Sequence, residues 1–202
     1  MRAPIGPFDH ARPAPDCLDE LTFPVAEAVR GRAGDLPVEE IVYVDTDPTV
    51  ADTAAFVAHY GQELLDTSAN CVVVAAKRGG GTTLAACLVP SGSRLDVNGA
   101  VRRHLGARKV SFAAMATAVE RTGMEHGGIT PLGLPADWPI LVDPAVAELP
   151  YVLVGSGSRR GKLIVPGRFF ARLPGAELVG GLAVAVATGP DGPEARPGPD
   201  AR

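Results

Sequence analysis

The residues best suited to chemistry lie in one loop, TGMEHGGITPLGLP at residues 122–135, in which six of the fourteen residues are Gly or Pro. Gly127 and Gly128 permit positive φ and let a ligand approach the backbone closely, while Pro131 fixes the shape of the loop. Such a loop could form a rigid wall of a small-molecule pocket. The alternative is a tight connection between a helix that ends at Gly123 and the next strand.

The residues that usually carry catalysis show no familiar arrangement. The four histidines share no metal-ligand spacing such as HExxH, and no GxSxG sequence frames a serine. His59 and His104 come shortly before predicted helix ends, where the helix dipole favours a cation. His126 lies inside the glycine loop, where it could reach a ligand or be merely exposed. We therefore expect neither a metal nor another cofactor.

A second glycine-rich segment, GSGSRRGK at residues 155–162, only faintly resembles a dinucleotide-binding or phosphate-binding loop. Both kinds of loop need a following helix whose N-terminus faces the phosphate. Here the run KLIVP predicts a strand instead, and a phosphate loop would also need a glycine at Ser156 and a hydroxyl residue at Leu163. The sequence thus argues against a nucleotide hydrolase or a nicotinamide enzyme.

The charge is unevenly distributed along a chain whose formal net charge is −4. Residues 77–109 contain seven Lys and Arg residues against Asp96 alone, which gives +6 for this segment and leaves −10 for the rest. This basic segment could follow the phosphates of a nucleic acid, with binding that weakens as salt rises. The alternative is an ordinary solvated surface on an acidic protein.

The apolar pattern predicts strands on both sides of the glycine loop. Two apolar runs joined by KRGGG, at 71–76 and 83–89, are typical of a hairpin with a glycine turn. Further strands are expected at residues 41–45, 140–142, 151–154 and 162–165.

Helices are expected between these strands. A short helix should lie within residues 21–34, and another should open at Thr49 as N-cap and end at Gly61. Asp96 or Asn98 should cap a helix that leaves Arg102 and Arg103 facing outward. A further helix should open at Ser111, with Phe112 and Met115 facing inward. Hairpins mixed with single helices predict an α+β domain with a mixed, curved sheet.

The two ends of the chain differ from this core. Both are rich in Pro and lack periodicity, so we expect a mobile extension at residues 1–20, one domain at 21–187 and a disordered tail at 188–202. No run approaches 18 apolar residues, and the first nine residues lack an apolar signal-peptide core, so no membrane span is expected. The three cysteines form no metal-ligand spacing and cannot all pair, which favours a reducing, cytoplasmic compartment.

The sequence of the glycine loop resembles that of a known protein family. TG followed by GGITPLG, after KVSFA and before WPIL, resembles the YbaK family of aminoacyl-tRNA deacylases, relatives of the editing insert in bacterial prolyl-tRNA synthetases. The resemblance spans roughly residues 41–183. It implies a single α+β domain with a barrel-like sheet flanked by helices.

The resemblance also implies roles for particular residues. The GxxxP loop would hold the terminal adenosine and aminoacyl group, and a small-residue turn would line the other side; the residues are His126, Gly127, Gly128, Ile129, Thr130 and Pro131 in the loop, and Gly155, Ser156 and Gly157 in the turn. Many family members have a lysine just before the apolar strand of the hairpin, where this chain has Asn70. Asparagine can donate a hydrogen bond but carries no charge. Asn70 could act as a neutral catalytic donor with Gly127 and Gly128, or simply cap the strand.

The resemblance therefore implies a trans-acting aminoacyl-tRNA deacylase that hydrolyses the ester of a mischarged small amino acid. The expected partner is tRNA through its aminoacylated 3′ end, with Arg78, Arg102 and Arg103 as tRNA-binding residues, and an aminoacyl-tRNA synthetase is a second candidate, with neither DNA nor a membrane. The absence of Lys at Asn70 leaves two other hypotheses open. One is a non-catalytic binder of charged tRNA or of a synthetase, and the other is a hydrolase for another small ester or nucleotide conjugate.

Overall fold

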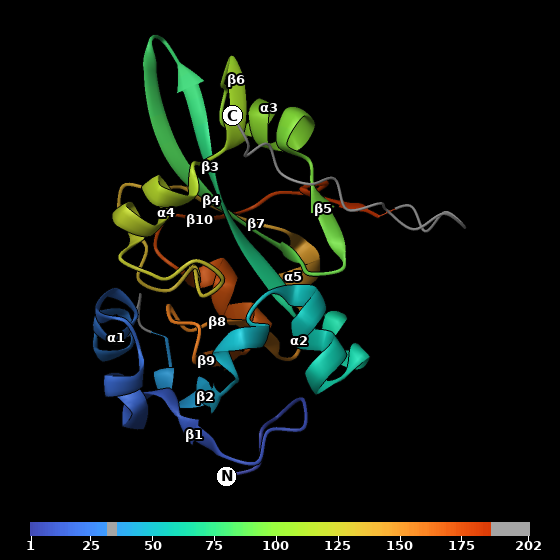
Figure 1. The fold of residues 1–202 in the computed structure, drawn as a ribbon. Coiled ribbons are helices and arrows are strands. Elements are labelled where there is room, and N and C mark those ends of the chain that lie inside the picture. The colour runs from blue at the N-terminus through green and yellow to red at the C-terminus, as the bar shows by residue number, and fades with distance from the viewer. Residues whose placement is uncertain (32–35, 187–202) are drawn as a thin grey trace, which may run out of the picture.

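The computed structural model describes residues 1–31 and 36–186 (Figure 1). The strands are β1 Ala11–Pro13, β2 Val42–Asp45, β3 Ala69–Arg78, β4 Gly81–Pro90, β5 Ser93–Leu95, β6 Lys109–Phe112, β7 Ile140–Val142, β8 Val152–Gly155, β9 Gly161–Val165, β10 Ala176–Leu178 and β11 Ala183–Ala185. The α-helices are α1 Phe23–Arg30, α2 Thr53–Tyr60, α3 Arg102–His104, α4 Met115–Thr122 and α5 Pro144–Glu148. Shorter 3₁₀ or π turns cover Ala14–Glu20, Val38–Glu40, Pro48–Val50, Gln62–Leu65, Val97–Val101 and Gly167–Arg172. The tail expected at 188–202 lies outside the described residues.

The predicted hairpin is the longest element of the fold. Strands β3 and β4 pair antiparallel over ten residues each, so that Asn70 lies opposite Val89 at one end and Arg78 opposite Gly81 at the other. The two turn residues Gly79 and Gly80 have φ values of 56° and 87°. A two-residue hairpin turn with positive φ at both positions matches the right-handed twist of the strands, which is why glycine is needed there.

This hairpin forms the centre of a mixed five-stranded sheet. The strand order is β10-β7-β4-β3-β6, with β7 parallel to β4 and to β10, and β6 antiparallel to β3. A second, antiparallel sheet has the order β1-β2-β9-β8. The two sheets meet where Ser68 bridges to Leu153 and Leu153 N donates to Thr67 O at 2.8 Å. In Figure 1 the hairpin end with β6 and α3 forms the upper part of the molecule, and the antiparallel sheet with α1 and α2 forms the lower part.

The largest apolar core joins α1 to the antiparallel sheet. Tyr43, Phe169 and Phe170 are fully buried in it, and α1 contributes Val25 and Val29. The helix begins and ends close to the expected positions, because its apolar residues repeat at helical spacing and Gly31 caps its end. The same argument correctly placed the helical turn after Asp96, whose carboxylate accepts hydrogen bonds from Gly99 N and Ala100 N.

The α+β fold class is confirmed, but the sheet differs from the expected barrel-like one. The strands of the described residues form three separate sheets, including the small pair β5-β11, and none of them closes into a barrel. Apolar runs identify strands, but the choice of pairing partner depends on which edges meet in three dimensions. The sequence pattern could not supply that information.

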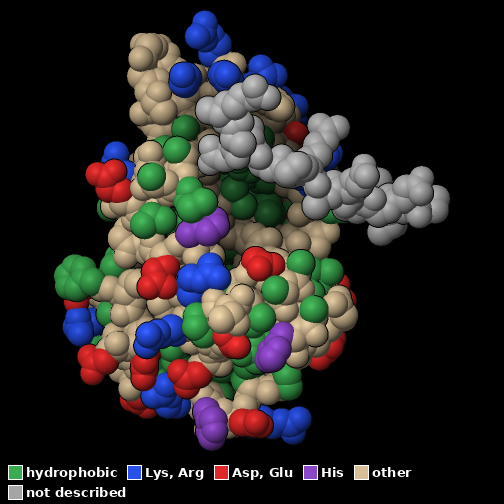
Figure 2. All heavy atoms as spheres, viewed as in Figure 1, with side chains coloured by type: hydrophobic (Ala, Val, Ile, Leu, Met, Phe, Trp, Pro, Cys, Tyr) green, Lys and Arg blue, Asp and Glu red, His purple; other side chains and the backbone are tan. Residues whose placement is uncertain are grey.

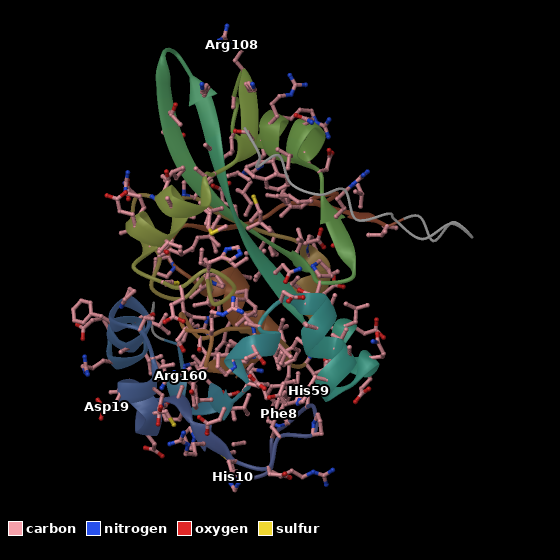
Figure 3. The ribbon with its side chains drawn as sticks, viewed as in Figure 1. Phe8, His10, Asp19, His59, Arg108 and Arg160 are labelled. Carbon is pink, nitrogen blue, oxygen red and sulfur yellow. The ribbon has the colours of Figure 1, made fainter. Side chains whose placement is uncertain are left out.

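The N-terminal residues, predicted to be a mobile extension, pack against the fold instead. Strand β1 pairs with β2, so that Ala11 lies opposite Val44. Phe8 is buried, with its ring centroid 5.4 Å from that of Tyr60, and lies near α2 at the bottom of the molecule (Figure 3). Proline in this segment is compatible with pairing because β1 is an edge strand, where a missing N–H costs no ladder hydrogen bond. The high proline content was therefore a misleading indicator of mobility.

Two predicted helix starts were also wrong. Thr49 does not cap α2, because Asp47 accepts from Thr49 N in a separate turn and Asp52 accepts from Ala55 N at the true helix start. The helix expected from Ser111 is strand β6 up to Phe112, since this segment pairs with the free edge of β3. Helix α4 begins only at Met115. Phe112 and Met115, expected to face inward, are instead 63% and 58% exposed.

Candidate functional site

A cavity of about 440 Å³ lies where the two large sheets meet. Its walls come from the start of α2, the start of β3, the end of β6, helix α4, the loop after α4, and strands β8 and β9. Phe112 and Met115 line it and are largely exposed, which places them at its mouth. The volume lies within the range of small-molecule sites in proteins, about 300–1,000 Å³.

Asn70 lines this cavity at the point where β3 leaves the junction of the sheets. Thr53 Oγ1, from the first turn of α2, lies 3.0 Å from Asn70 Oδ1. The side-chain oxygen of Asn70 is therefore engaged by the protein, and its amide nitrogen is the group left to donate to a ligand. The prediction that Asn70 acts as a neutral donor is compatible with this geometry and stays a prediction.

The glycine loop contributes His126, Gly127 and Ile129 to the cavity wall. Gly127 has φ 84°, and a Cβ there would lie 2.9 Å from Arg159 Nη1. The left-handed backbone is what favours glycine at this position, because the guanidinium is the far end of a side chain that can shift. The loop is thus a pocket wall, as the sequence suggested.

Gly128 has a different role from its neighbour. Its amide N–H donates to Glu125 O at 2.9 Å, and its carbonyl accepts from Gly157 N at 2.8 Å. A Cβ on Gly128 would lie 2.5 Å from Ser158 O, and one on Gly155 would lie 2.1 Å from Gly128 O. Gly128 therefore lets the loop pack directly on the turn between β8 and β9, and its N–H is already used within the protein.

The cavity gathers some of the sequence-predicted binding residues and leaves others behind its wall. Gly155 lines it from the end of β8. Ser156 is buried and donates to Gly161 O at 2.8 Å, and Gly157 packs on Thr22 at the start of α1. Thr130 and Pro131 are buried and do not line the cavity. Ser156, Gly157, Thr130 and Pro131 therefore lie behind the cavity wall and support it.

Sequence reasoning missed Lys162, which lines the cavity from β9. It is only 8% exposed, and its Nζ lies 3.4 Å from Ala51 O, 3.3 Å from Gly127 O and 5.4 Å from the centroid of the Phe56 ring. Because side chains alternate along a strand, Lys162 points to the same face as Ile164, toward α2. A signal was present in the sequence, since this lysine begins an otherwise apolar strand, GKLIV.

The surroundings of Lys162 disfavour its charged form. Burial, together with the nearby Arg159 and partly opposed by Asp52, lowers the pKa of Lys162 to about 8. Arg159 is held in place because its guanidinium donates to Pro48 O and to His126 O. Among the ion pairs of residues 1–31 and 36–186, none involves Lys162. This side of the cavity is therefore positively charged without a bound carboxylate.

The cysteines contribute no reactive group to the cavity. Cys71 lines it, but burial raises the pKa of the Cys71 thiol far above its usual value, and burial raises that of Cys87 to about 12. No cluster of three or more His, Cys, Asp or Glu suited to a metal ion occurs in the described part of the chain.

The predicted tRNA-binding arginines lie far from the cavity, at the outer end of the five-stranded sheet. Arg78 ends β3, and Arg102 and Arg103 are exposed on α3. Figure 2 shows Lys and Arg side chains gathered at this upper end, and Arg108 stands at its tip in Figure 3. Eight residues of extended strand separate Asn70 from Arg78, which corresponds to about 26 Å.

Comparisons with known proteins agree with this geometry. The family model described as an aminoacyl-tRNA editing domain matches residues 47–173, and the chain belongs to this family. The crystal structure of "a putative trans-editing enzyme for prolyl tRNA synthetase" superposes with a TM-score of 0.61 at 21% identity, covering 77% of this chain and 94% of that one. The hypothetical protein APE2540 gives a TM-score of 0.60 at 24% identity, covering 77% and 98%.

These structural likenesses establish the fold, and the family match establishes an editing domain. Both bear out the resemblance to YbaK-type proteins that the glycine loop indicated. No helix in the described residues is long and apolar enough to cross a membrane.

Proposed function

We propose that this protein is a trans-acting aminoacyl-tRNA deacylase that hydrolyses the ester linking a mischarged small amino acid to tRNA. The observation that carries the proposal is the cavity, because it lies within an editing domain and draws polar groups from β3, β9 and the glycine loop. A cavity of about 440 Å³ suits a terminal nucleoside with a small aminoacyl group. Selection by pocket shape fits such substrates, because binding alone separates small side chains by only about 1–3 kcal/mol per methylene.

The reaction needs no protein nucleophile. An aminoacyl ester is already activated, so hydrolysis can proceed by holding the ester, polarising its carbonyl and orienting a water molecule. In this proposal Asn70 donates from its amide nitrogen, which is supported by the hydrogen bond that its oxygen accepts from Thr53 Oγ1. His126, Gly127 and Ile129 form the wall against which the substrate would rest.

The basic end of the five-stranded sheet suits the body of the same substrate. Arg78, Arg102 and Arg103 are exposed, and this end lies about 26 Å from Asn70 along β3. A tRNA whose 3′ end enters the cavity could therefore lay its phosphates on this surface. Such contacts add affinity without reading the base sequence, and they weaken as salt rises.

A deacylation assay tests the proposal. Purified protein is incubated with a panel of tRNAs that each carry one mischarged amino acid, and release of the amino acid is compared with the decay of the same ester alone. Faster release for one or a few small amino acids, and not for large ones, is expected.

The second candidate function is a binder of charged tRNA or of a synthetase that lacks catalysis. It is favoured by the uncharged Asn70, which stands where the resemblance to the YbaK family implies a lysine. The assay separates the two functions, because a binder would retain aminoacyl-tRNA in a filter-binding measurement while the ester decays at its uncatalysed rate or more slowly.

A further inference from the structure

A buried ammonium group faces the cavity from strand β9. Lys162 lies in a central strand of the antiparallel sheet, between β2 and β8, so its backbone position is fixed by pairing on both sides. Its side chain reaches the gap between the start of α2 and the glycine loop, where Nζ meets Ala51 O and Gly127 O. The paired backbone and the walls of this gap set the place from which the ammonium can donate, as a preorganised donor requires.

The hydrogen-bonding capacity of this ammonium is not used up by the protein. Lysine has three N–H donors, and the contacts to Ala51 O and Gly127 O are long, at 3.4 and 3.3 Å. No carboxylate of the described residues forms an ion pair with it. At least one donor and most of the charge are therefore available to an oxygen atom bound in the cavity.

We infer that Lys162 is a catalytic residue of the proposed deacylase, whose ammonium donates a hydrogen bond to the carbonyl oxygen of the aminoacyl ester and stabilises the negative charge that forms there. This inference rests on the proposed function. It assigns the positive charge of the site to Lys162 on β9, whereas the family resemblance implied a lysine at the start of β3, where this chain has Asn70. Asn70 and Lys162 line the same cavity. The lysine of β9 can therefore supply the positive charge to a site that has no lysine on β3.

The depth of Lys162 favours the ester over a phosphate of the tRNA backbone. The side chain is 8% exposed, whereas Phe112 and Met115 at the mouth are exposed. The aminoacyl group is the outermost part of a charged tRNA and enters the cavity first. The terminal phosphate follows it by one nucleoside and lies nearer the mouth. A deep cation is therefore closest to the ester carbonyl.

The chemical step then balances as a simple hydrolysis. The oxygen of a water molecule attacks the carbonyl carbon, and the electron pair of the C=O π bond moves to the carbonyl oxygen, where Lys162 donates to it. The electron pair on this oxygen then re-forms the C=O bond, and the bond between the carbonyl carbon and the ribose oxygen breaks. The ribose oxygen takes a proton that originates from the water. The products are a free amino acid and a tRNA with its terminal hydroxyl restored.

The charged groups around Lys162 define the pH dependence. Arg159, from the turn before β9, and Asp52, from the start of α2, act on its charge, and the other titratable groups that line the same cavity are His126 of the glycine loop and the Cys71 thiol of β3. The catalytic form is the ammonium, and its pKa is about 8. After subtraction of hydroxide-driven decay, kcat should fall as the pH rises through about 8.

The test compares Lys162→Met and Lys162→Gln with wild type on the mischarged tRNA that wild type hydrolyses fastest. Lys162→Met should lower kcat about 10²- to 10³-fold, the usual effect of losing one preorganised oxyanion donor, with little change in KM. Lys162→Gln keeps a neutral donor, so it should recover part of kcat and lose the fall above pH 8. Arg30→Met, which removes an exposed cation at the end of α1, is the matched control and should not change kcat.

The outcomes separate this inference from the proposed function. If wild type hydrolyses no ester, both are overturned. If wild type is active and Lys162→Met retains its kcat while melting normally, the deacylase stands and the role of Lys162 is refuted. A wild-type kcat that rises through pH 8 would show that neutral Lys162 acts as a base, which also overturns oxyanion stabilisation.

Discussion

Replacing Lys162 with methionine should make the folded protein more stable near neutral pH, although it removes a side chain from the centre of the site. Methionine is close to lysine in length and apolar, so it can fill the same space beside Phe56. The variant removes a charge that burial disfavours. Opposite changes in activity and stability are typical of a functional site and not of a structural ion pair.

The magnitude follows from the pKa of Lys162. This pKa is about 8 in the folded protein against an ordinary value of 10.5, and a separation of that size corresponds to roughly 3 kcal/mol in favour of the neutral form. Losing the two long hydrogen bonds to Ala51 O and Gly127 O opposes this by about 1 kcal/mol or somewhat more. We expect Lys162→Met to raise the free energy of unfolding by about 1–2 kcal/mol at pH 7.

The gain should depend on pH in a defined direction. Below pH 8 the folded and unfolded chains both carry the proton, so the cost of the buried ammonium is fully present in wild type. Between about pH 8 and 10.5 the unfolded chain binds more protons than the folded one, so the stability of wild type rises with pH relative to the variant. The advantage of Lys162→Met should therefore shrink over this window and be gone near pH 10.5.

Urea unfolding at pH 7 and pH 10 measures this difference, with Arg30→Met as a variant that removes an exposed charge. Other groups titrate alike in wild type and variant, so the change in their stability difference reports on Lys162. A variant less stable than wild type at pH 7, or a difference independent of pH, would refute the description of Lys162 as a buried, unpaired ammonium.

Four further variants test the rest of the site. Asn70→Ala should lower kcat by about two to three orders of magnitude with little loss of stability, because it removes one preorganised donor; unchanged deacylation would leave Asn70 as a cap of its strand. Reversing Arg102 and Arg103 to Glu should weaken tRNA binding and reduce its salt dependence by about one unit of slope for each lost phosphate contact; identical salt titrations would place tRNA on another face. Phe112→Ala should raise KM for aminoacyl-tRNA without lowering the melting temperature, because an exposed ring at the cavity mouth can stack on a base for about 1–3 kcal/mol; a lower melting temperature with the same KM would mean that the ring serves packing only. Gly128→Ala should lower the melting temperature, because its Cβ would lie 2.5 Å from a backbone carbonyl of the β8–β9 turn; wild-type stability would show that this turn can move.

The sequence by itself determined the elements whose signals are local. The hairpin followed from two apolar runs around a glycine turn, and the helix after Asp96 followed from its cap and its apolar spacing. The residues of the glycine loop were sufficient to indicate the editing family and to suggest that Gly127 lies in a pocket wall. These features depend on interactions between residues that are close in the chain, so the sequence alone is enough to predict them.

Other features depended on contacts between distant segments. The free edge of β3 pairs with residues 109–112, which turned an expected helix into β6 and left Phe112 at the mouth of the cavity. The edge of β2 likewise pairs with β1 near the start of the chain. An unpaired strand edge can pair with any segment that the fold brings beside it. The periodicity of the sequence does not show which segment that will be.

Lys162 shows the same limit at the level of function. In the sequence it is a lysine near the start of an apolar strand, which marks it as unusual but does not say whether its side chain faces solvent or the interior. Pairing of β9 between β2 and β8 sets its direction, and α2 and the glycine loop then close over its side chain. Its burial, its lowered pKa and its place in the same cavity as Asn70 all arise from this assembly, and the pKa is lowered because only the folded chain creates low-dielectric surroundings.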